Sequence, residues 1–214
     1  MAVITISRLV GSGGTMIGKE VAKRMDYKYV DKDFIQEIME QYGELEFQKI
    51  YDTKLSVWDR YSGITDGIID FFRRIMFSIA KVGNVVIIGR GSFFSLGKYD
   101  DVIDVMIYAP MAARIKAIME MRNISEPAEA ERYIIRKEQI RQSFIEHTYG
   151  LKWNQVDNFD MVFNTGKFSS SLVVETIVMA AQALKKNVSA TGVNTSEISE
   201  DVVLDETVKK LLRV

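Results

Sequence analysis

Residues 2–25 read AVITISRLVGSGGTMIGKEVAKRM, and this stretch decides the fold. Its first six residues, AVITIS, form an apolar and largely β-branched run that leads to a cluster of glycines. Such a run predicts a buried strand that enters a tight turn. From Thr15 onward apolar residues recur at the spacing of a helix, at Ile17, Val21, Ala22 and Met25. The stretch therefore predicts a strand, a glycine loop and a helix in immediate succession.

Strands and helices continue to alternate along the chain. Further strands are predicted in YKYVDKDFI, which closes on Asp31, and in NVVIIGRG, VIDVMIYA and FDMVFNT. Helices are predicted for residues 66–82, from Pro110 to about residue 121, from a cap at Ser125 onward, and over about residues 170–185. Strands that are apolar on both faces and alternate with helices indicate an α/β fold, an open parallel sheet wrapped by helices. Ligands of such sheets bind at the carboxyl ends of the strands.

The chain changes character after residue 186. Residues 187–199, NVSATGVNTSEIS, lose the periodicity and are predicted to be a linker. Residues 200–214 are predicted to form a short amphipathic helix, with an apolar stripe of Val203, Leu204, Val208, Leu211 and Leu212. Asp205 and Lys209, and likewise Glu206 and Lys210, are spaced to pair at i,i+4. We expect this helix to pack on its own body or on another subunit, which leaves a homo-oligomer open.

The composition argues against several classes of function. The 214 residues carry a formal net charge of -1, whereas a nucleic-acid-binding protein normally has a strong basic excess, so no nucleic-acid partner is expected. Zero cysteines exclude disulfides and thiolate chemistry, and a single histidine argues against a zinc site built from His and Cys. No signal-peptide pattern and no window of roughly 18 apolar residues is present. We therefore expect a cytoplasmic protein without a membrane partner.

The glycine loop can be aligned with phosphate-binding motifs in more than one register. A P-loop needs G-x-x-x-x-G-K-[ST] between a strand and a helix, because its backbone N–H groups surround the phosphates while the lysine and the hydroxyl reach phosphate and Mg²⁺. GGTMIGKE, Gly13 to Glu20, matches up to its last residue. This register would place the loop inside the predicted helix, with Glu20 where a hydroxyl is needed. We reject it and interpret Lys19 as a solvated surface lysine.

The second register begins where the strand ends. RLVGSGGT, Arg8 to Thr15, places Gly11 and Gly13 in the loop and Thr15 in the first turn of the helix. Arg8 stands where the motif has its first glycine, and Gly14 stands where it has its lysine. Thr15 still offers a hydroxyl to a metal ion, and the helix N-terminus offers N–H groups and a partial positive charge to a phosphate. Catalysis would need a positive charge from elsewhere, and Arg8 is the nearest candidate.

A third register is the dinucleotide-binding fingerprint G-x-G-x-x-G. Gly11 and Gly13 fit it, and Asp31 lies at the end of the second strand, where an acid that binds ribose is expected. Met16 occupies the third glycine position, where a glycine lets helix and strand pack closely, so it argues against this interpretation. A glycine turn without any ligand is the remaining alternative.

Six segments carry a resemblance to a known family: ITISRLVGSGG, YVDKDFI, VVIIGRGSFF, DVMIYAPMAARIKAIMEMRNIS, KEQIRQSF and NFDMVFNT. In this order and spacing, over about residues 1–185, they resemble the cytidylate kinase-like family, relatives of bacterial cytidylate kinase among the P-loop nucleoside monophosphate kinases. The resemblance implies a P-loop NTPase-like domain over residues 1–186 with a helical lid at about residues 122–150. It also implies that the loop without a lysine is a trait of the family.

The resemblance places a donor ATP at the glycine loop. Its phosphates are expected on the loop and the helix start, at Gly11, Ser12, Gly13, Gly14 and Thr15. Thr15 is also expected to hold Mg²⁺, and Arg8 to act in catalysis in place of the lysine. Asn164 and Thr165, at the end of the last strand, are expected to border the donor base, although such a pair is often only a turn.

The acceptor and the lid are expected on the other side of the loop. Arg90 lies between two glycines directly after a buried strand, and its planar fork can grip the acceptor phosphate or pair with a nearby carboxylate. Asp31 is expected to bind the acceptor or simply to cap the next helix. In the lid, Arg136 and Arg141 best match the arginines that neutralise the moving phosphoryl group in related kinases, a solvated helix face being the alternative. Arg114 is expected to contact the lid.

The residues support three hypotheses about function. The leading one is an ATP- and Mg²⁺-dependent kinase that transfers a phosphoryl group to a nucleoside monophosphate, with CMP or dCMP first among the acceptors. The second is a nucleotide-binding regulator that keeps the pocket without turnover, which Gly14 in place of lysine favours. The third is a dinucleotide-binding oxidoreductase.

Overall fold

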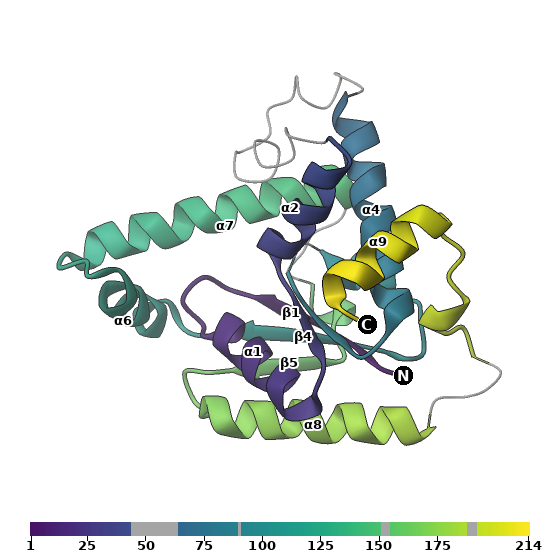
Figure 1. Ribbon diagram of the computed structural model, residues 1–214. Coiled ribbons are helices and arrows are strands. Elements are labelled where there is room, and N and C mark those ends of the chain that lie inside the picture. The colour runs from purple at the N-terminus through teal and green to yellow at the C-terminus, as the bar shows by residue number, and fades with distance from the viewer. Residues whose placement is uncertain (44–63, 90, 151–154, 188–191) are drawn as a thin grey trace.

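The computed structural model describes residues 1–43, 64–89, 91–150, 155–187 and 192–214 (Figure 1). The strands are β1 (Val3–Arg8), β2 (Lys28–Val30), β3 (Val85–Ile88), β4 (Val102–Tyr108) and β5 (Met161–Asn164). The helices are α1 (Gly14–Met25), α2 (Lys32–Gln41), α4 (Ile64–Val82), α5 (Ser92–Leu96), α6 (Met111–Arg122), α7 (Pro127–Tyr149), α8 (Ser170–Asn187) and α9 (Val202–Leu212), with 3₁₀ turns at Val156–Asn158 and Thr195–Glu197. In the described ranges, no helix is both long and apolar enough to cross a membrane.

The strands form one parallel sheet in the order β2-β3-β1-β4-β5. β1 is central, because Val3 is in register with Val85 of β3 on one side and with Val102 of β4 on the other. All four residues of β3 and the first five of β1 are buried, as expected of strands covered on both faces. The predicted open parallel sheet is confirmed. In the dinucleotide-binding order β2 lies beside β1, whereas here β3 separates them, so the topology argues against the third register.

Helices cover both faces of the sheet (Figure 1). On one face α1 and α8 pack against Ile4 and Ile6 of β1. On the other face α2, α4, α5 and α9 enclose a second core that includes Val3. There Phe72 of α4 meets Phe144 of α7 edge to face, with ring centroids 5.7 Å apart. Successive side chains of a strand point to opposite faces, so β1 supplies both cores.

α9 packs on α4 of the same chain and lies in front of it in Figure 1. Its buried face consists of Leu204, Val208 and Leu212. Val203 of the predicted stripe is exposed instead. Asp205 pairs with Lys81 of α4 at 2.6 Å, not with Lys209 as predicted, because the side chain faces the core rather than solvent. Of the two packing partners expected for this helix, its own body is the one found.

The first residue of the predicted linker, Asn187, is the last residue of α8, and residues 192–199 of the linker lie against the body. Thr195 is buried, and its N–H and hydroxyl donate to the two carboxylate oxygens of Asp101 at 2.8 and 2.6 Å. The N–H of Asp100 donates to the carbonyl of Val193 at 2.8 Å. Individual hydrogen bonds hold this segment, which explains why its sequence has no periodicity. The division into domain, linker and tail stays a prediction.

The start of α7 differs from the prediction. Glu126 occupies the N-cap position without a side-chain cap hydrogen bond, and Pro127 is the first helical residue, so Ser125 lies outside the cap. Proline at this position suits a helix start, because its φ is already helical and its missing N–H would have no partner there. Pro127 therefore determines where α7 begins, a role that was predicted for Ser125.

Asp104 of β4 is a buried carboxylic acid, 5% exposed. The hydroxyl of Thr5 in β1 donates to it, and its own N–H donates to Asp160 Oδ2 at 2.8 Å. Burial raises the pKa of Asp104 from 3.8 to about 7; the bond from Thr5 opposes this rise and the charge of Asp160 adds to it. The folded protein therefore holds the Asp104 proton more tightly than the unfolded chain does.

We expect the free energy of unfolding to fall as the pH rises from about 4 to about 7, because the stabilisation by the bound proton is lost over that range. The loss amounts to as much as about 4 kcal/mol, at about 1.4 kcal/mol per pKa unit. Asp104→Asn keeps an oxygen for Thr5 and should remove this pH dependence in urea titrations at pH 5 and pH 8. Asp157→Asn, at an exposed position, is the control; a parental pH dependence in Asp104→Asn would contradict the assignment.

Candidate phosphate-binding site

The glycine loop joins β1 to α1 at the carboxyl edge of the sheet. Gly11 and Gly13 have φ of +82° and +77°, the left-handed conformation that favours glycine. Gly13 is the N-cap of α1, and the first N–H groups of a helix have no partner inside it. Thr15 is exposed in the first turn. The loop has the geometry of the second register, whereas the rejected register lies in α1, where the exposed Lys19 ammonium lies 5.5 Å from the ring centroid of Tyr29.

Arg8 and Gly14 are sterically complementary. A Cβ added at Gly14 would lie 2.6 Å from the Cβ of Arg8 and 3.0 Å from its Cγ. Carbon atoms do not approach so closely in a packed interior, so glycine is the residue that fits at position 14 while arginine stands at position 8. An ordinary P-loop has glycine at the first of these positions and lysine at the second. Here the glycine and the long cation have exchanged places.

The half-buried Arg8 side chain packs against the end of β3. A Cβ at Gly89, whose φ is +72°, would overlap the Arg8 guanidinium. Burial first, and the charge of Arg141 second, lower the pKa of Arg8 to about 9 against the opposing effects of Tyr29 and Asp31. Its Nε is buried and has no hydrogen-bond partner within the described ranges. An anion beside this guanidinium would therefore stabilise its charge.

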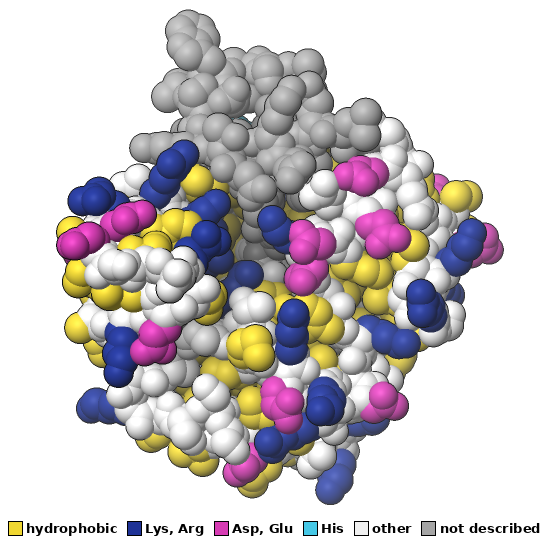
Figure 2. Space-filling view, turned by 60° about the vertical axis from the view of Figure 1, so that its left-hand side comes forward, with side chains coloured by type: hydrophobic (Ala, Val, Ile, Leu, Met, Phe, Trp, Pro, Cys, Tyr) yellow, Lys and Arg dark blue, Asp and Glu magenta, His cyan; other side chains and the backbone are white. Residues whose placement is uncertain are grey.

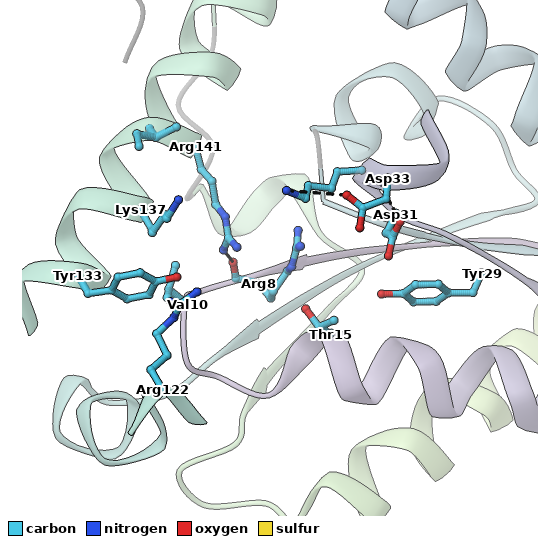
Figure 3. Close-up of a pocket in the computed structure, with 12 residues that line it drawn as sticks. Arg8, Val10, Thr15, Tyr29, Asp31, Asp33, Arg122, Tyr133, Lys137 and Arg141 are labelled. Atoms are coloured by element: carbon cyan, nitrogen blue, oxygen red, sulfur yellow. Dashed lines mark hydrogen bonds and ion pairs between the residues drawn. The ribbon is translucent and has the colours of Figure 1, made fainter. Parts of the chain in front are cut away.

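A cavity of about 320 Å³ opens between the glycine loop, α2 and the helices α6 and α7 (Figure 3). Its lining residues are Arg8, Val10, Thr15, Tyr29, Asp31, Lys32, Asp33, Arg122, Tyr133, Lys137, Ile140 and Arg141. The space-filling view shows Lys and Arg side chains around a hollow on this side of the molecule (Figure 2). The structure thus brings together four of the predicted site residues, Arg8, Thr15, Asp31 and Arg141.

One face of α7 borders the cavity. Arg141 Nη1 donates to the carbonyl oxygen of Arg8 at 3.2 Å, and burial lowers the pKa of Arg141. Arg136 is exposed and does not line the cavity, whereas Lys137 does. Residues four apart share a helix face, so Lys137 and Arg141 point the same way. The structure thus places Lys137, and not Arg136, on the cavity side of α7 beside Arg141, and the catalytic role predicted for Arg136 stays a prediction.

Further cavity residues were not predicted. Arg122, the last residue of α6, lies with its guanidinium 4.3 Å from the ring centroid of Tyr133 in α7. The Tyr29 hydroxyl is buried without a hydrogen-bond partner in the described residues, and burial raises its pKa to about 12, so it is a neutral donor. Lys32 and Asp33 form an ion pair at 3.8 Å beside Asp31. The charged run DKD at residues 31–33 could have indicated Lys32 and Asp33. No local sequence pattern indicates Arg122 or Tyr29, which the fold brings to the cavity.

Asp31 both caps α2 and lines the cavity. Its Oδ1 accepts hydrogen bonds from the N–H groups of Asp33 at 3.0 Å and Phe34 at 3.4 Å. The capping alternative is therefore confirmed, and contact with an acceptor stays a prediction. Arg90 lies outside the described residues, so its predicted role is a prediction as well. Gly91 beside it has φ of +68°, in keeping with the predicted turn after β3.

Ser12, Asn164 and Thr165 are engaged in holding the loop and the end of β5. The Ser12 hydroxyl donates to the carbonyl of Ile107 in β4 at 3.1 Å. The Thr165 hydroxyl donates to the carbonyl of Ser12 at 2.8 Å, and Asn164 Oδ1 accepts from the N–H of Gly166 at 2.9 Å. Neither Asn164 nor Thr165 lines the cavity. The end of β5 thus supports the loop from behind, and contact with a donor base stays a prediction.

Arg114 makes the lid contact predicted for it. The side chain is buried in α6, and Nη1 lies 2.6 Å from Glu138 Oε1 in α7. The same carboxylate oxygen accepts the N–H of Val10 in the glycine loop at 3.1 Å. One cluster therefore connects the loop to α6 and to α7, the helix in the predicted lid range.

Comparisons with known proteins agree with this geometry. Cytidylate kinase from Pyrococcus horikoshii is 29% identical over 170 residues, which cover 78% of this chain and 81% of that protein. Cytidylate kinase from Methanocaldococcus jannaschii is 27% identical over 186 residues, which cover 86% and 99%. A solved structure of an uncharacterized protein from Eubacterium ventriosum is 17% identical with a TM-score of 0.66, covering 86% of this chain and 99% of the other, and shows the same fold.

The match to a protein-family model is the most direct evidence for the family of this chain. It spans all five strands, the glycine loop and the helices α6 and α7. The match covers residues 3–167, which include every residue that lines the cavity. By this match the chain belongs to the cytidylate kinase-like family.

Proposed function

We propose that this protein is a kinase that transfers a phosphoryl group from ATP to a nucleoside monophosphate, with CMP or dCMP as the acceptor. The observation that carries the proposal is the convergence of Arg8, Lys137 and Arg141 with Thr15 in one cavity. Phosphoryl transfer depends on positioning and on cations that neutralise the charge spread over the moving group. The relatives named cytidylate kinase support this choice of reaction and acceptor.

The glycine loop is proposed as the donor side. The N–H groups at the start of α1 would bind donor phosphates, and Arg8 would supply the charge that lysine supplies elsewhere. Thr15 would hold Mg²⁺, which neutralises phosphate charge when bound. Mg²⁺ at such sites takes much of its coordination from phosphates and water, so the exposed Thr15 hydroxyl fits this role. No group of three or more His, Cys, Asp or Glu among the described residues forms a metal cage of its own.

The side of the cavity near α2 is proposed as the acceptor side. Asp31 and Asp33 present carboxylates that can accept hydrogen bonds from sugar hydroxyls or a base amino group. The neutral Tyr29 hydroxyl can donate to a phosphate oxygen, and Arg90 is proposed to grip the acceptor phosphate. The lid cations Lys137 and Arg141 would then close on the phosphoryl group between the two substrates.

Lys137→Ala should lower kcat/KM by about 10- to 100-fold, because a half-buried cation that would neutralise charge in the transition state is lost. Arg136→Ala is the matched control, since it removes a cation from the adjacent, exposed position and should leave kcat/KM within about twofold of the parent. Steady-state kinetics with ATP and CMP measure both. A larger loss in Arg136→Ala than in Lys137→Ala would overturn the assignment of the lid face.

A nucleotide-binding regulator is the second candidate, favoured by glycine at position 14 where a P-loop has its catalytic lysine. Such a protein would keep the cavity and its cations and would bind ATP without turnover. Arg8 argues for the enzyme, because it lines the cavity and supplies a cation to a loop that lacks its lysine.

The deciding experiment is a coupled assay of ADP release with ATP, Mg²⁺ and each of CMP, dCMP, UMP, AMP and GMP, beside thermal shifts for the same ligands. We expect turnover with CMP or dCMP. Turnover with another monophosphate would keep the kinase and change its acceptor. A clear thermal shift with ATP and no turnover on any acceptor would favour the regulator.

A further inference from the structure

We propose that Glu138 of α7 is a positioning residue that locks the lid helix to the phosphate loop, so that loop and lid take up their active arrangement as one unit. The inference rests on the proposed kinase function. Glu138 does not line the cavity, and its carboxylate is directed at Val10 and Arg114. It acts through the residues it holds.

The lock consists of three groups from three parts of the chain. Glu138 Oε1 accepts the Val10 N–H at 3.1 Å and pairs with Arg114 Nη1 at 2.6 Å. Arg114 Nη1 also lies 3.3 Å from the Val10 carbonyl oxygen. The side chains of Arg114 and Glu138 are only 8% and 20% exposed, so these charge-assisted bonds are shielded from water and strong.

The backbone of the glycine loop has little room to move at this cluster. A Cβ at Gly11 would lie 2.8 Å from the carbonyl oxygen of Arg114, so the loop backbone packs directly on α6. The N–H of Val10 is directed at Glu138 and not at the phosphate site. Arg114 and Glu138 together therefore set the path of the loop just before its phosphate-binding glycines.

The lid side of the lock orients the catalytic cations. Lys137 precedes Glu138 in α7 and Arg141 lies one turn later, and both line the cavity. Arg141 also donates to the carbonyl oxygen of Arg8, which makes a second tie between α7 and the loop region (Figure 3). Without Glu138, the middle of α7 would lose its tie to Val10 and Arg114, although the core contacts of Ile134 and Phe144 still hold the helix as a whole. The segment that carries Lys137 and Arg141 would then be less precisely placed against the loop. A misplacement of about 1 Å can cost about 100-fold in rate.

Two variants separate the geometry of the lock from its charge. Glu138→Ala removes the acceptor for Val10 and leaves the buried Arg114 charge unpaired. Glu138→Gln keeps an oxygen for Val10 but removes the charge opposite Arg114. Glu131→Gln is the control, since it neutralises an exposed carboxylate on the same helix.

We expect Glu138→Ala to lower kcat about 100-fold while KM for CMP stays within about threefold, because the proposed acceptor residues Tyr29, Asp31 and Asp33 lie in β2 and at the start of α2, outside the loop and helices that Glu138 ties together. Glu138→Gln should fall between Glu138→Ala and the parent, and Glu131→Gln should match the parent. In the protein without nucleotide, hydrogen exchange should become faster in Glu138→Ala at residues 9–14 and in α7, with β1 and β3 unchanged. Parental kcat in folded Glu138→Ala, or faster exchange spread evenly over the sheet, would overturn the proposal.

The two measurements keep this inference separate from the proposed function. If the parent protein turns over no nucleoside monophosphate, the kinase proposal fails while hydrogen exchange still decides the lock. Faster exchange confined to residues 9–14 and α7 would then support the lock as a device of a nucleotide-binding protein. Unchanged exchange in Glu138→Ala would refute it.

Discussion

Arg8→Ala should lower kcat for phosphoryl transfer by about 10³- to 10⁵-fold, the range known for arginines that stabilise a transferring phosphoryl group. The loop has no lysine, and Arg8 begins it: the Cβ and Cγ of Arg8 pack against Gly14, and its guanidinium lies beside Gly89. Arg8→Lys should recover part of the loss, because lysine keeps the charge but lacks the planar fork. Steady-state ADP release with saturating ATP and CMP measures the effect.

The control for this prediction is Arg24→Ala, which removes an exposed arginine of α1 that pairs with Glu20 at 3.0 Å. It should leave kcat unchanged. Thermal melting of each variant verifies that it is folded at the assay temperature. If folded Arg8→Ala transfers phosphate as fast as the parent, Arg8 does not replace the lysine.

Gly14→Lys and Arg8→Gly should each reduce kcat by at least about 10³-fold, and the double variant should return to within about 10-fold of the parent. Lysine at position 14 alone would collide with Arg8, whose Cβ and Cγ lie only 2.6 and 3.0 Å from where the new Cβ would be. Glycine at position 8 alone leaves the loop without a cation. Together the two changes give the full G-x-x-x-x-G-K-T pattern over residues 8–15.

A double-mutant cycle measures this exchange directly, because the two sites are in contact and their effects cannot simply add. Gly14→Lys combined with Arg24→Gly is the matched control and should stay inactive. Parental activity in Gly14→Lys alone would show that Arg8 does not occupy the space at position 14. Additive losses in the double variant would show that the two positions are not equivalent.

The fold was largely predictable because its central strands β1, β3 and β4 are buried on both faces and several of its helices are amphipathic. β3 is the clearest case: all four of its residues are apolar and all are buried. The predictions were wrong where a contact with a distant part of the chain is made in place of the contact expected within a helix. Asp205 has a suitable partner one turn away in Lys209, yet it turns inward to Lys81 because it lies beside the buried face of α9.

The site residues that lie next to the end of a strand could be predicted from the sequence. The residues on α7 could not, because the sequence alone does not show which side of that helix faces the cavity. Arg8, Thr15 and Asp31 lie at strand or helix ends, which the parallel sheet gathers at one edge. Arg136 and Lys137 are adjacent in sequence, and only the packing of α7 shows which of them faces the cavity. For the same reason the sequence did not reveal that Glu138, the next residue, faces inward as the partner of Arg114.

The packing of α9 on α4 also affects the order in which the protein can fold during synthesis. Lys81 and Asp205 are separated by 124 positions, so the apolar surface of α4 is made long before Leu204, Val208 and Leu212 arrive to cover it. A ribosome that adds about 5 to 20 residues per second leaves that surface open for roughly 6 to 25 seconds. During this interval the nascent chain exposes an apolar helix face, and chaperones have their best opportunity to bind it.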